Sequence, residues 1–415
     1  MPDYAVFREQ PRPVQRLETI VKILLGGVPL GCDNIGDGAI IACVVKLLRS
    51  LFPDAELTVC TREREKTAHL LDVATAPLYG FPPAPDWEGF ENEVRRHDVY
   101  FWFGATGLSD YPECALRLLD TAHAAGVKTI VWGVGMNSRL NPAFYRAGGK
   151  KRQLLLLLTL CSLGLINWVS VYEERLCRAT RDHIRRSLEN CALVVLRDAE
   201  SVHELERCGF KRGITGADTA ILLKSADFPL KQEPGATRIG FCISAQNIVR
   251  NLVGMRKLWA SLLSHPEIRL VLIPMNPKTD RALMRILAEG LDHPERIECL
   301  ENDSPDVVQA CAGQCRLVVS SRLHLLILAA NAGVPGLGIE RGSKISNWLN
   351  AFGRTSSGTV ENCDPALLER QILELIARPR EQLEAQTLAV MKQMHERLDK
   401  ASALLREALA GKSRS

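Results

Sequence analysis

The sequence carries little net charge. Lys and Arg number 52, Asp and Glu number 48, and the formal net charge over 415 residues is +4. A dedicated nucleic-acid-binding protein would show a clustered basic face. The charge balance therefore argues against nucleic acid as a partner, whereas local basic pockets for an acidic substrate remain compatible with it.

The sequence also lacks paired metal-ligand motifs. Its thirteen cysteines are scattered, and most lie in apolar contexts, which is the usage expected in a reducing compartment. Cys311 and Cys315 are four residues apart, but no second Cys or His pair at zinc spacing accompanies them. The first residues are polar and include Pro11 and Pro13, so no secretory signal is expected. We expect a cytoplasmic protein that needs no metal and no cofactor.

Long uncharged runs are scarce, and residues 153–172 form the notable one. This run begins near five consecutive leucines and is just long enough to span a bilayer, but Gly164 and Asn167 disfavour a span. The basic residues 150–152 directly before it could dock on an anionic membrane surface. We favour a solvated loop followed by a buried helix. Peripheral contact of residues 148–170 with the inner face of the membrane is the alternative.

Apolar strands alternate with helical segments along the whole chain and end in Gly-rich turns. This pattern is typical of parallel, doubly wound sheets, and it restarts after a Pro-containing linker at 227–234. We therefore expect an α/β protein with two Rossmann-like domains, residues 1–230 and 231–415, in a GT-B-type arrangement with a C-terminal helix. The main expected strands are 21–26, 55–60, 98–103, 128–132, 192–196, 238–244, 269–273, 317–320 and 334–339, and the main expected helices are 39–51, 115–125, 201–207, 252–263, 280–290 and 365–410.

The most informative segment is residues 316–344. A short apolar strand leads into a turn with Arg322 and His324, an apolar helix ends at Gly333, and a second strand precedes Lys344. The turn therefore lies at the carboxyl end of a strand and at a helix N-terminus, where open α/β sheets bind anions. Three cationic or protonatable groups are expected to converge on one anion.

Two further turns occupy equivalent positions in the first half. Asn34, Gly36 and Asp37 follow the first strand and open a helix, without the Gly-x-Gly-x-x-Gly spacing of a nicotinamide site. Arg197 follows the strand at 192–196, and the neighbouring Asp198 is expected to cap the next helix. Each residue also has a structural explanation. Asp37 could be a helix cap, and Arg197 could pair with Asp198.

These blocks together resemble the polysaccharide pyruvyl transferase family. The resemblance rests on Asn34-Ile-Gly-Asp37, on the Arg-Asp-x-x-Ser block at 197–201 with Ala217-Asp218, and on Arg322-Leu-His324 with Gly333-Val-Pro335 and Lys344. It implies a GT-B-type fold with a site in the cleft between the two domains. We interpret Asp218 mainly as a structural turn residue.

The resemblance implies a transferase that moves the pyruvyl group of phosphoenolpyruvate onto sugar hydroxyls and forms a pyruvate ketal in cell-surface polysaccharide biosynthesis. The acceptor would be a nucleotide- or lipid-linked sugar. His324 is the candidate acid or base, and Asp37 is a second catalytic candidate. Donor and acceptor contacts would come from Arg197, Arg322, Lys344, Asn34 and Gly36.

Each cationic candidate again has an alternative. Arg322 could form a salt bridge across the domain interface, and Lys344 could be an exposed loop lysine. Two other functions compete with pyruvyl transfer. One is a GT-B glycosyltransferase that uses a nucleotide sugar, and the other is a non-catalytic homologue that binds anionic glycans.

Overall fold

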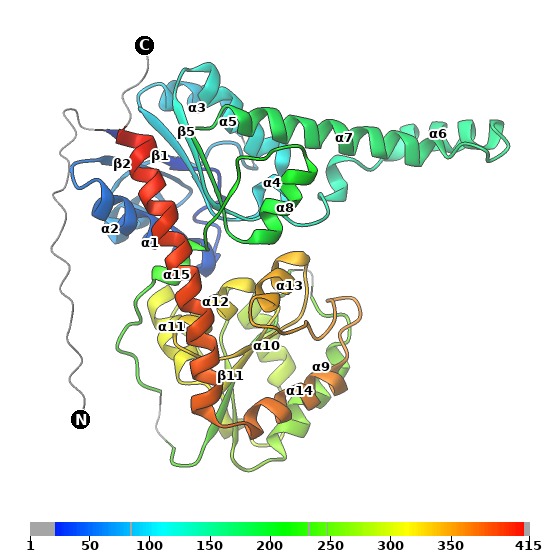
Figure 1. The fold of residues 1–415 in the computed structure, drawn as a ribbon. Coiled ribbons are helices and arrows are strands. Elements are labelled where there is room, and N and C mark those ends of the chain that lie inside the picture. Colours follow the sequence, from blue (N-terminus) through cyan, green and yellow to red (C-terminus); the bar gives the residue numbers. More distant parts are fainter. Residues whose placement is uncertain (1–20, 84, 231–232, 247, 411–415) are drawn as a thin grey trace.

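The computed structural model describes residues 21–83, 85–230, 233–246 and 248–410. The first twenty residues of the expected N-terminal domain and part of the expected linker lie outside these ranges. The described chain forms two parallel β-sheets with helices on their faces, one above the other in Figure 1. The expected α/β fold with two Rossmann-like sheets is confirmed.

The first sheet has seven parallel strands in the order β3-β2-β1-β4-β5-β6-β7. Its central strands are buried along their whole length, as expected for parallel strands that are covered on both faces. The direction of strand order changes between β1 and β4. The strands are β1 (Lys22–Gly26), β2 (Glu56–Thr61), β3 (Ala74–Pro77), β4 (Val99–Phe103), β5 (Lys128–Val134), β6 (Leu193–Leu196) and β7 (Ile214–Thr215).

The second sheet has five parallel strands in the order β10-β9-β8-β11-β12, with its change of direction between β8 and β11. Ligands of open α/β sheets bind at the carboxyl ends of the strands beside such a switch point. The turn with Asn34 follows the switch-point strand β1, and the turn with Arg322 follows the switch-point strand β11, whereas Arg197 follows β6 (Leu193–Leu196). The strands are β8 (Thr237–Cys242), β9 (Ile268–Leu272), β10 (Ile297–Cys299), β11 (Leu317–Ser320) and β12 (Gly336–Gly338).

Helix caps and a proline explain the helix boundaries, including those that differ from the expected ones. The first helix begins at Ile35 rather than at Ala39, because the side chain of Asn34 accepts a hydrogen bond from the backbone N–H of Gly36. The expected cap at Asp198 is confirmed, since its side chain accepts from the N–H of Ser201. The C-terminal helical region divides around Pro379 into α14 and α15.

The helices cover both sheets, and the long C-terminal helix reaches from one to the other. The α-helices are α1 (Ile35–Leu51), α2 (Arg64–Leu71), α3 (Trp87–Val94), α4 (Gly107–Asp110), α5 (Pro112–Ala124), α6 (Gly149–Cys161), α7 (Trp168–Glu189), α8 (Ala199–Arg207), α9 (Leu252–Leu263), α10 (Thr279–Ala288), α11 (Pro305–Gly313), α12 (Leu323–Asn331), α13 (Ser343–Asn350), α14 (Pro365–Ala377) and α15 (Arg380–Ala410). The described residues also form the 3₁₀ turns η1 (Pro142–Phe144), η2 (Thr219–Leu222) and η3 (Pro294–Arg296).

Helix α15 belongs to both halves of the molecule. Its first turn contributes Leu383 to the core of the second sheet, whereas Met391 through Leu409 join the core that contains the first sheet. Its far end contacts β6 and β7, and Lys128 donates a hydrogen bond to the carbonyl of Ala408. The helix therefore runs up the side of the molecule across both sheets (Figure 1).

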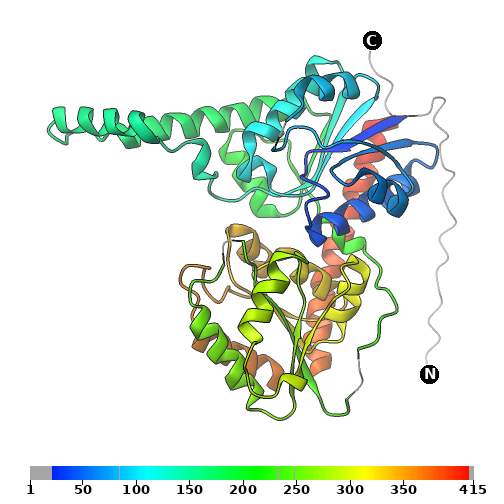
Figure 2. The ribbon, with the colours of Figure 1, turned by 180° about the vertical axis from the view of Figure 1, so that it is seen from behind.

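Helices α6 and α7 form a hairpin that projects away from the first sheet (Figure 1 and Figure 2). Its base is anchored, because Asp120 on α5 contacts both His183 and Ser187 on α7. Helix α6 has no buried residue, so the interpretation of 153–172 as a buried helix is wrong. Within the described residues, no helix combines the length and the apolar character needed to cross a bilayer.

Candidate functional site

The two sheets face each other across loops that touch directly. The backbone N–H of Ile35 donates to the carbonyl of Met275 at 3.1 Å, and the Lys278 ammonium lies 2.8 Å from Asp33. On the other side, the N–H of Ser138 donates to Ser343 Oγ at 3.0 Å. The carboxyl ends of both sheets therefore meet at one interdomain site.

His324, on the first turn of α12, contacts residues from the first domain. Its Nε2 lies 3.5 Å from Oδ2 of Asp218, and neither of these buried atoms has a hydrogen-bond partner among the described residues. On the opposite side, a Cβ atom at Gly36 would lie 2.1 Å from His324 Nδ1. Only glycine leaves room for the imidazole there, so Gly36 packs closely against the ring.

Asp218 joins His324 to Arg197. The same Oδ2 atom lies 3.9 Å from Nη1 of Arg197, whose side chain is 5% exposed and also contacts Asp198. Burial opposes ionisation of Asp218, but His324 and Arg197 outweigh it and hold the pKa of its carboxyl below the usual range. A single buried carboxylate thus brings together the two candidate residues that the sequence places on separate sheets.

Arg322 has its guanidinium fork engaged within its own domain. Its Nε and Nη2 atoms each donate to Asp280 at 2.9 Å, and Asp280 is completely buried. The same carboxylate accepts from the backbone N–H groups of Ala245 and Asn276. The alternative of a salt bridge across the domain interface is therefore wrong, because Arg322 pairs within its own domain. Nη1 is the guanidinium nitrogen that this pair leaves for a donor anion.

Lys344 and Arg341 are the least compensated cations near the site. Among the described residues, neither has an acidic group within ion-pair distance, and the buried Nε of Arg341 has no hydrogen-bond partner. Burial, followed by the charge of Arg322, lowers the pKa of Arg341 to about 10. For Lys344, burial is again the largest cause, Asp110 opposes it, and Arg341 adds to it, so that its pKa falls to about 8. Such a site favours an anion that would neutralise it.

Asp37 lies in the first turn of α1 and is buried. Burial raises the pKa of its carboxyl, although His324, Asn34 and Lys344 act in the opposite direction. Asn34 is the cap of this helix, so the alternative of Asp37 as the cap does not hold. A carboxyl group with a raised pKa beside His324 can donate or accept a proton during a reaction.

Sequence reasoning missed several members of this cluster. The sequence marks Asp218 only weakly, through the family resemblance, and gives no prediction for Arg341, Asp110 and Asp280. Arg341 carried a usable signal, because it follows the strand after the Arg-Leu-His turn and precedes Lys344 by three residues. Asp280 opens a helix in an unremarkable context, so only the fold reveals its pairing with Arg322.

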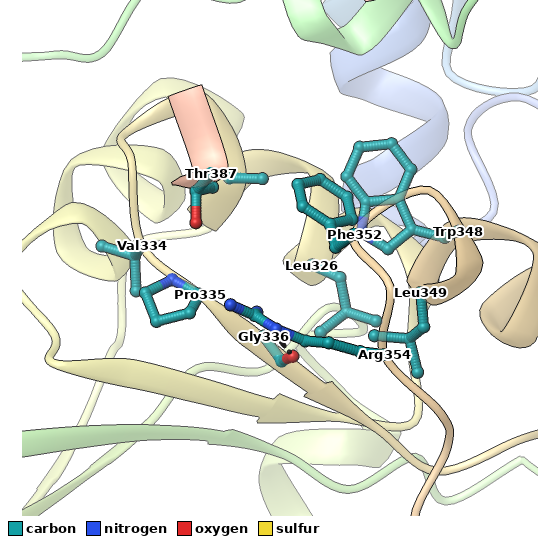
Figure 3. A pocket seen from close by; sticks show the side chains of 10 residues that line it. Leu326, Val334, Pro335, Gly336, Trp348, Leu349, Phe352, Arg354 and Thr387 are labelled. Atoms are coloured by element: carbon teal, nitrogen blue, oxygen red, sulfur yellow. Dashed lines mark hydrogen bonds between the residues drawn. The ribbon is translucent and has the colours of Figure 1, made fainter. Parts of the chain in front are cut away.

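Two cavities of the described chain contain none of the charged residues of this cluster. Figure 3 shows a pocket of about 10 Å³ beside Val334 and Thr387, which is at the limit for a single water molecule. An open groove of about 340 Å³ lies at the base of the α6–α7 hairpin and is lined by Ser138, Arg139 and Arg181, among others. Ser138 is the residue that bonds Ser343, so this groove adjoins the interdomain site. Among the residues that the structure describes, no group of three or more His, Cys, Asp or Glu side chains could hold a metal ion.

Two parallel sheets with a site between their carboxyl edges define a protein of the GT-B class. The chain belongs to the polysaccharide pyruvyl transferase family, since the sequence profile described as "Polysaccharide pyruvyl transferase" matches residues 34–343. It is therefore an enzyme, a transferase. The matched range extends from Asn34, which caps α1, to Ser343, which precedes Lys344. A comparison with curated proteins gives no match.

Solved structures agree with the fold. The UDP-GlcNAc 2-epimerase from Neisseria meningitidis, bound to UDP-GlcNAc, aligns over 94% of this chain and 99% of its own with a TM-score of 0.56 and 12% identity. HepE from Anabaena, in complex with UDP and glucose, aligns over 95% and 100% with a TM-score of 0.56 and 10% identity. The spinosyn rhamnosyltransferase SpnG aligns over 94% and 100% with a TM-score of 0.55 and 15% identity. At these identities the likeness concerns the fold alone.

Proposed function

We propose that this enzyme uses phosphoenolpyruvate as its donor and forms a pyruvate ketal on a sugar of a cell-surface polysaccharide. The observation that carries the proposal is the uncompensated pair of cations, Arg341 and Lys344, beside Arg322 and His324. Phosphoenolpyruvate presents a phosphate and a carboxylate on one small frame, so it needs several fixed cations at short range. Membership of the family supports pyruvyl transfer as the reaction. The cluster of Arg322, His324, Arg341 and Lys344 is where we expect the donor anion to bind.

The proton steps are assigned to His324 and Asp37. An acid protonates the methylene carbon of the donor, and the resulting cationic centre at C2 accepts the first sugar hydroxyl. Phosphate leaves, and a second hydroxyl attacks the same carbon to close the ketal. Each hydroxyl gives up one proton, which His324 or Asp37 accepts. Asp218, 3.5 Å from His324 Nε2, orients the imidazole and stabilises its protonated form.

The cations are assigned to the phosphate group that leaves the donor. Lys344 and Arg341 bind the phosphate. Arg197, from the opposite sheet, pairs with Asp218 and helps to keep this carboxylate charged beside His324. Fixed positive groups of this kind stabilise the charge that develops on the leaving group. No metal ion is needed in this scheme.

The acceptor is proposed to be a nucleotide- or lipid-linked sugar. The groove at the hairpin base adjoins the site. Its wall carries Arg139 and Arg181, which can bind the phosphate of an acceptor, together with Glu173 and Glu174. We place the reaction in the cytoplasm, because the thirteen cysteines are all free and many are buried, which supports a reducing compartment.

Phosphate release and thermal unfolding test the proposal together. Phosphoenolpyruvate at saturating concentration should raise the unfolding temperature, because a ligand that binds only the native state must do so. Release of inorganic phosphate should then require both phosphoenolpyruvate and a sugar acceptor. If phosphoenolpyruvate leaves the unfolding temperature unchanged, the donor assignment fails.

A nucleotide-sugar glycosyltransferase is the second candidate. It is favoured by one observation, namely that aligned GT-B proteins are described as complexes with UDP, UDP-GlcNAc or glucose. In the same assay, stabilisation by UDP or a UDP-sugar without stabilisation by phosphoenolpyruvate would favour this candidate instead.

A further inference from the structure

The exposed apolar surface of the described chain is concentrated at the tip of the α6–α7 hairpin. Ten of its fourteen exposed large hydrophobic side chains lie between Leu154 and Val171. Leu160, Leu163 and Leu165 are 73%, 88% and 86% exposed. A monomer in water rarely presents such a contiguous patch without a partner for it. We call residues 153–172 the hairpin tip.

The hairpin tip is apolar on every side of α6. Leu154 through Leu158 are consecutive, so their side chains point in all directions around the helix axis, and none of them is buried. A protein partner covers one face of a helix and leaves the rest in water. A helix that is apolar all round instead suits surroundings that enclose it, as hydrocarbon does.

The length of the tip matches the depth of one leaflet of a bilayer. The uncharged part of α6 runs from Gln153 to Cys161, which at 1.5 Å per residue spans about 13 Å. A bilayer has a hydrocarbon core of about 30 Å, so one leaflet measures about 15 Å. The tip thus matches the depth of one leaflet, in agreement with the finding that no described helix could cross a membrane.

Three cations on α6 and a tyrosine on α7 mark the end of the tip nearest the first sheet, where Glu173 accepts from the N–H of Ala147 and Glu174 pairs with Arg178. Lys150, Lys151 and Arg152 are exposed at the start of α6. The Lys151 ammonium lies 4.1 Å from the centre of the Tyr172 ring on α7 and donates to its hydroxyl, so the two arms are level here. Lys, Arg and Tyr at the boundary of an apolar segment are typical of the lipid headgroup region, and the positive charges select anionic lipids.

We propose that the hairpin tip inserts into one leaflet of an anionic lipid bilayer, with residues 150–152 at the headgroups. The anchored base of α7, through Asp120, then holds the catalytic domains at a fixed height above the membrane. This inference is independent of the donor and of the reaction, since it concerns a surface that lies outside the interdomain site.

Vesicle flotation of the full chain tests the proposal. The protein should float with vesicles of phosphatidylcholine containing 30% phosphatidylglycerol, and it should bind vesicles of phosphatidylcholine alone at least tenfold less. A variant with Leu160→Glu, Leu163→Glu and Leu165→Glu should lose binding by at least a hundredfold. The matched control is Val253→Glu on α9, where an equally exposed apolar side chain lies outside the hairpin and binding should be retained.

Insertion depth gives a second readout that does not depend on loss of binding. Trp168 lies in the tip and is 36% exposed. Its fluorescence should be quenched by lipids brominated on their acyl chains, and the quenching should disappear in a Trp168→Phe variant. Replacement of Lys150, Lys151 and Arg152 by Gln should remove the preference for phosphatidylglycerol while leaving residual apolar binding.

Three outcomes would overturn the proposal. The first is a wild-type chain that does not float with anionic vesicles. The second is a triple-Glu variant that floats as well as the wild type. The third is self-association of the wild type, abolished in the triple-Glu variant, without any quenching of Trp168 by brominated lipids, because the tip would then be an interface between copies of this chain. A failure of phosphoenolpyruvate binding would leave all of these measurements unchanged.

Discussion

Replacement of Lys344 by Met should make the ligand-free protein more stable and, at the same time, weaken donor binding. Met keeps the length of the side chain and removes its charge. In the native protein the charged form of Lys344 is disfavoured, since burial and Arg341 lower its pKa from 10.5 to about 8. A lysine whose pKa is lower in the folded state destabilises that state throughout the range below pH 8, and the effect fades as the pH rises toward the unfolded value.

The magnitude follows from the pKa change. The lowering from 10.5 to about 8 corresponds to at most about 3.5 kcal/mol of destabilisation at neutral pH, because a tenfold change in a proton equilibrium is worth about 1.4 kcal/mol. The side chain is only partly buried, so solvent reduces this to about 1 to 2 kcal/mol. For the donor, one charge about 4 Å from a phosphate contributes about 4 kcal/mol at an effective dielectric constant of 20. Partial solvation reduces this contribution by half, to about 2 kcal/mol. Its loss in Lys344→Met corresponds to about thirtyfold weaker binding of the donor.

Thermal unfolding with and without phosphoenolpyruvate measures both effects in one experiment. Lys344→Met should raise the unfolding temperature of the free protein and shrink the increase that the donor produces. Calorimetry from pH 6.5 to 9.5 should show that wild-type affinity falls as the pH rises through about 8, since the free protein must then take up a proton to bind the anion. This pH dependence should be absent in Lys344→Arg, which stays charged.

Lys257→Met, at an exposed position on α9, is the control for loss of a surface charge. Unchanged stability and unchanged donor affinity in Lys344→Met would mean that Lys344 is an ordinary surface lysine at the start of α13. The anion site would then have to be sought elsewhere in the cleft.

Three further predictions concern the neighbours of this lysine. His324→Gln should abolish phosphate release while calorimetry shows donor affinity within about tenfold of the wild type, because the residue transfers protons; near-normal turnover would remove it from the mechanism. Gly36→Ala introduces a Cβ that would lie 2.1 Å from His324 Nδ1, so the ring must move and turnover should fall by about a hundredfold, measured at saturating donor; wild-type turnover would show that the position of the imidazole is not critical. Arg322→Lys should lower the free energy of unfolding in urea by about 1 to 3 kcal/mol, since the buried Asp280 loses its bidentate partner, and should weaken donor binding by a similar amount. If only stability changes, Arg322 serves Asp280 and not the donor.

Local patterns were sufficient for much of the fold. Apolar runs such as Val99–Phe103 and Leu193–Leu196 are buried strands, because a parallel sheet covered on both faces requires apolar residues throughout. The turn before His324 lies at the carboxyl end of β11, as its place between a strand and a helix indicated. Such features depend on short segments, whose residues determine their own conformation.

Long-range pairings could not be predicted in this way. The contact of Asp218 with His324 joins residues more than a hundred positions apart, and a single sequence contains no signal for it. The same holds for Arg322 and Asp280, whose pairing engages the guanidinium fork that the sequence interpretation had reserved for the donor. For residues 153–172, apolar character alone does not distinguish a buried helix from an exposed one. The interpretation failed there because the surroundings of the segment are determined by the rest of the fold.

The path of α15 makes the first domain discontinuous in sequence. Residues 391–409 of this helix complete the core around the first sheet, although more than 150 residues of the second domain separate them from β7. A chain cut at residue 230 would leave that part of the first domain's apolar surface in water, and a chain that starts at 231 would carry the same apolar face without its partner. During synthesis the first domain cannot bury this surface until residues 391–409 have been made. Its final packing must therefore wait for the second domain, so the two halves are expected to mature together and not in succession.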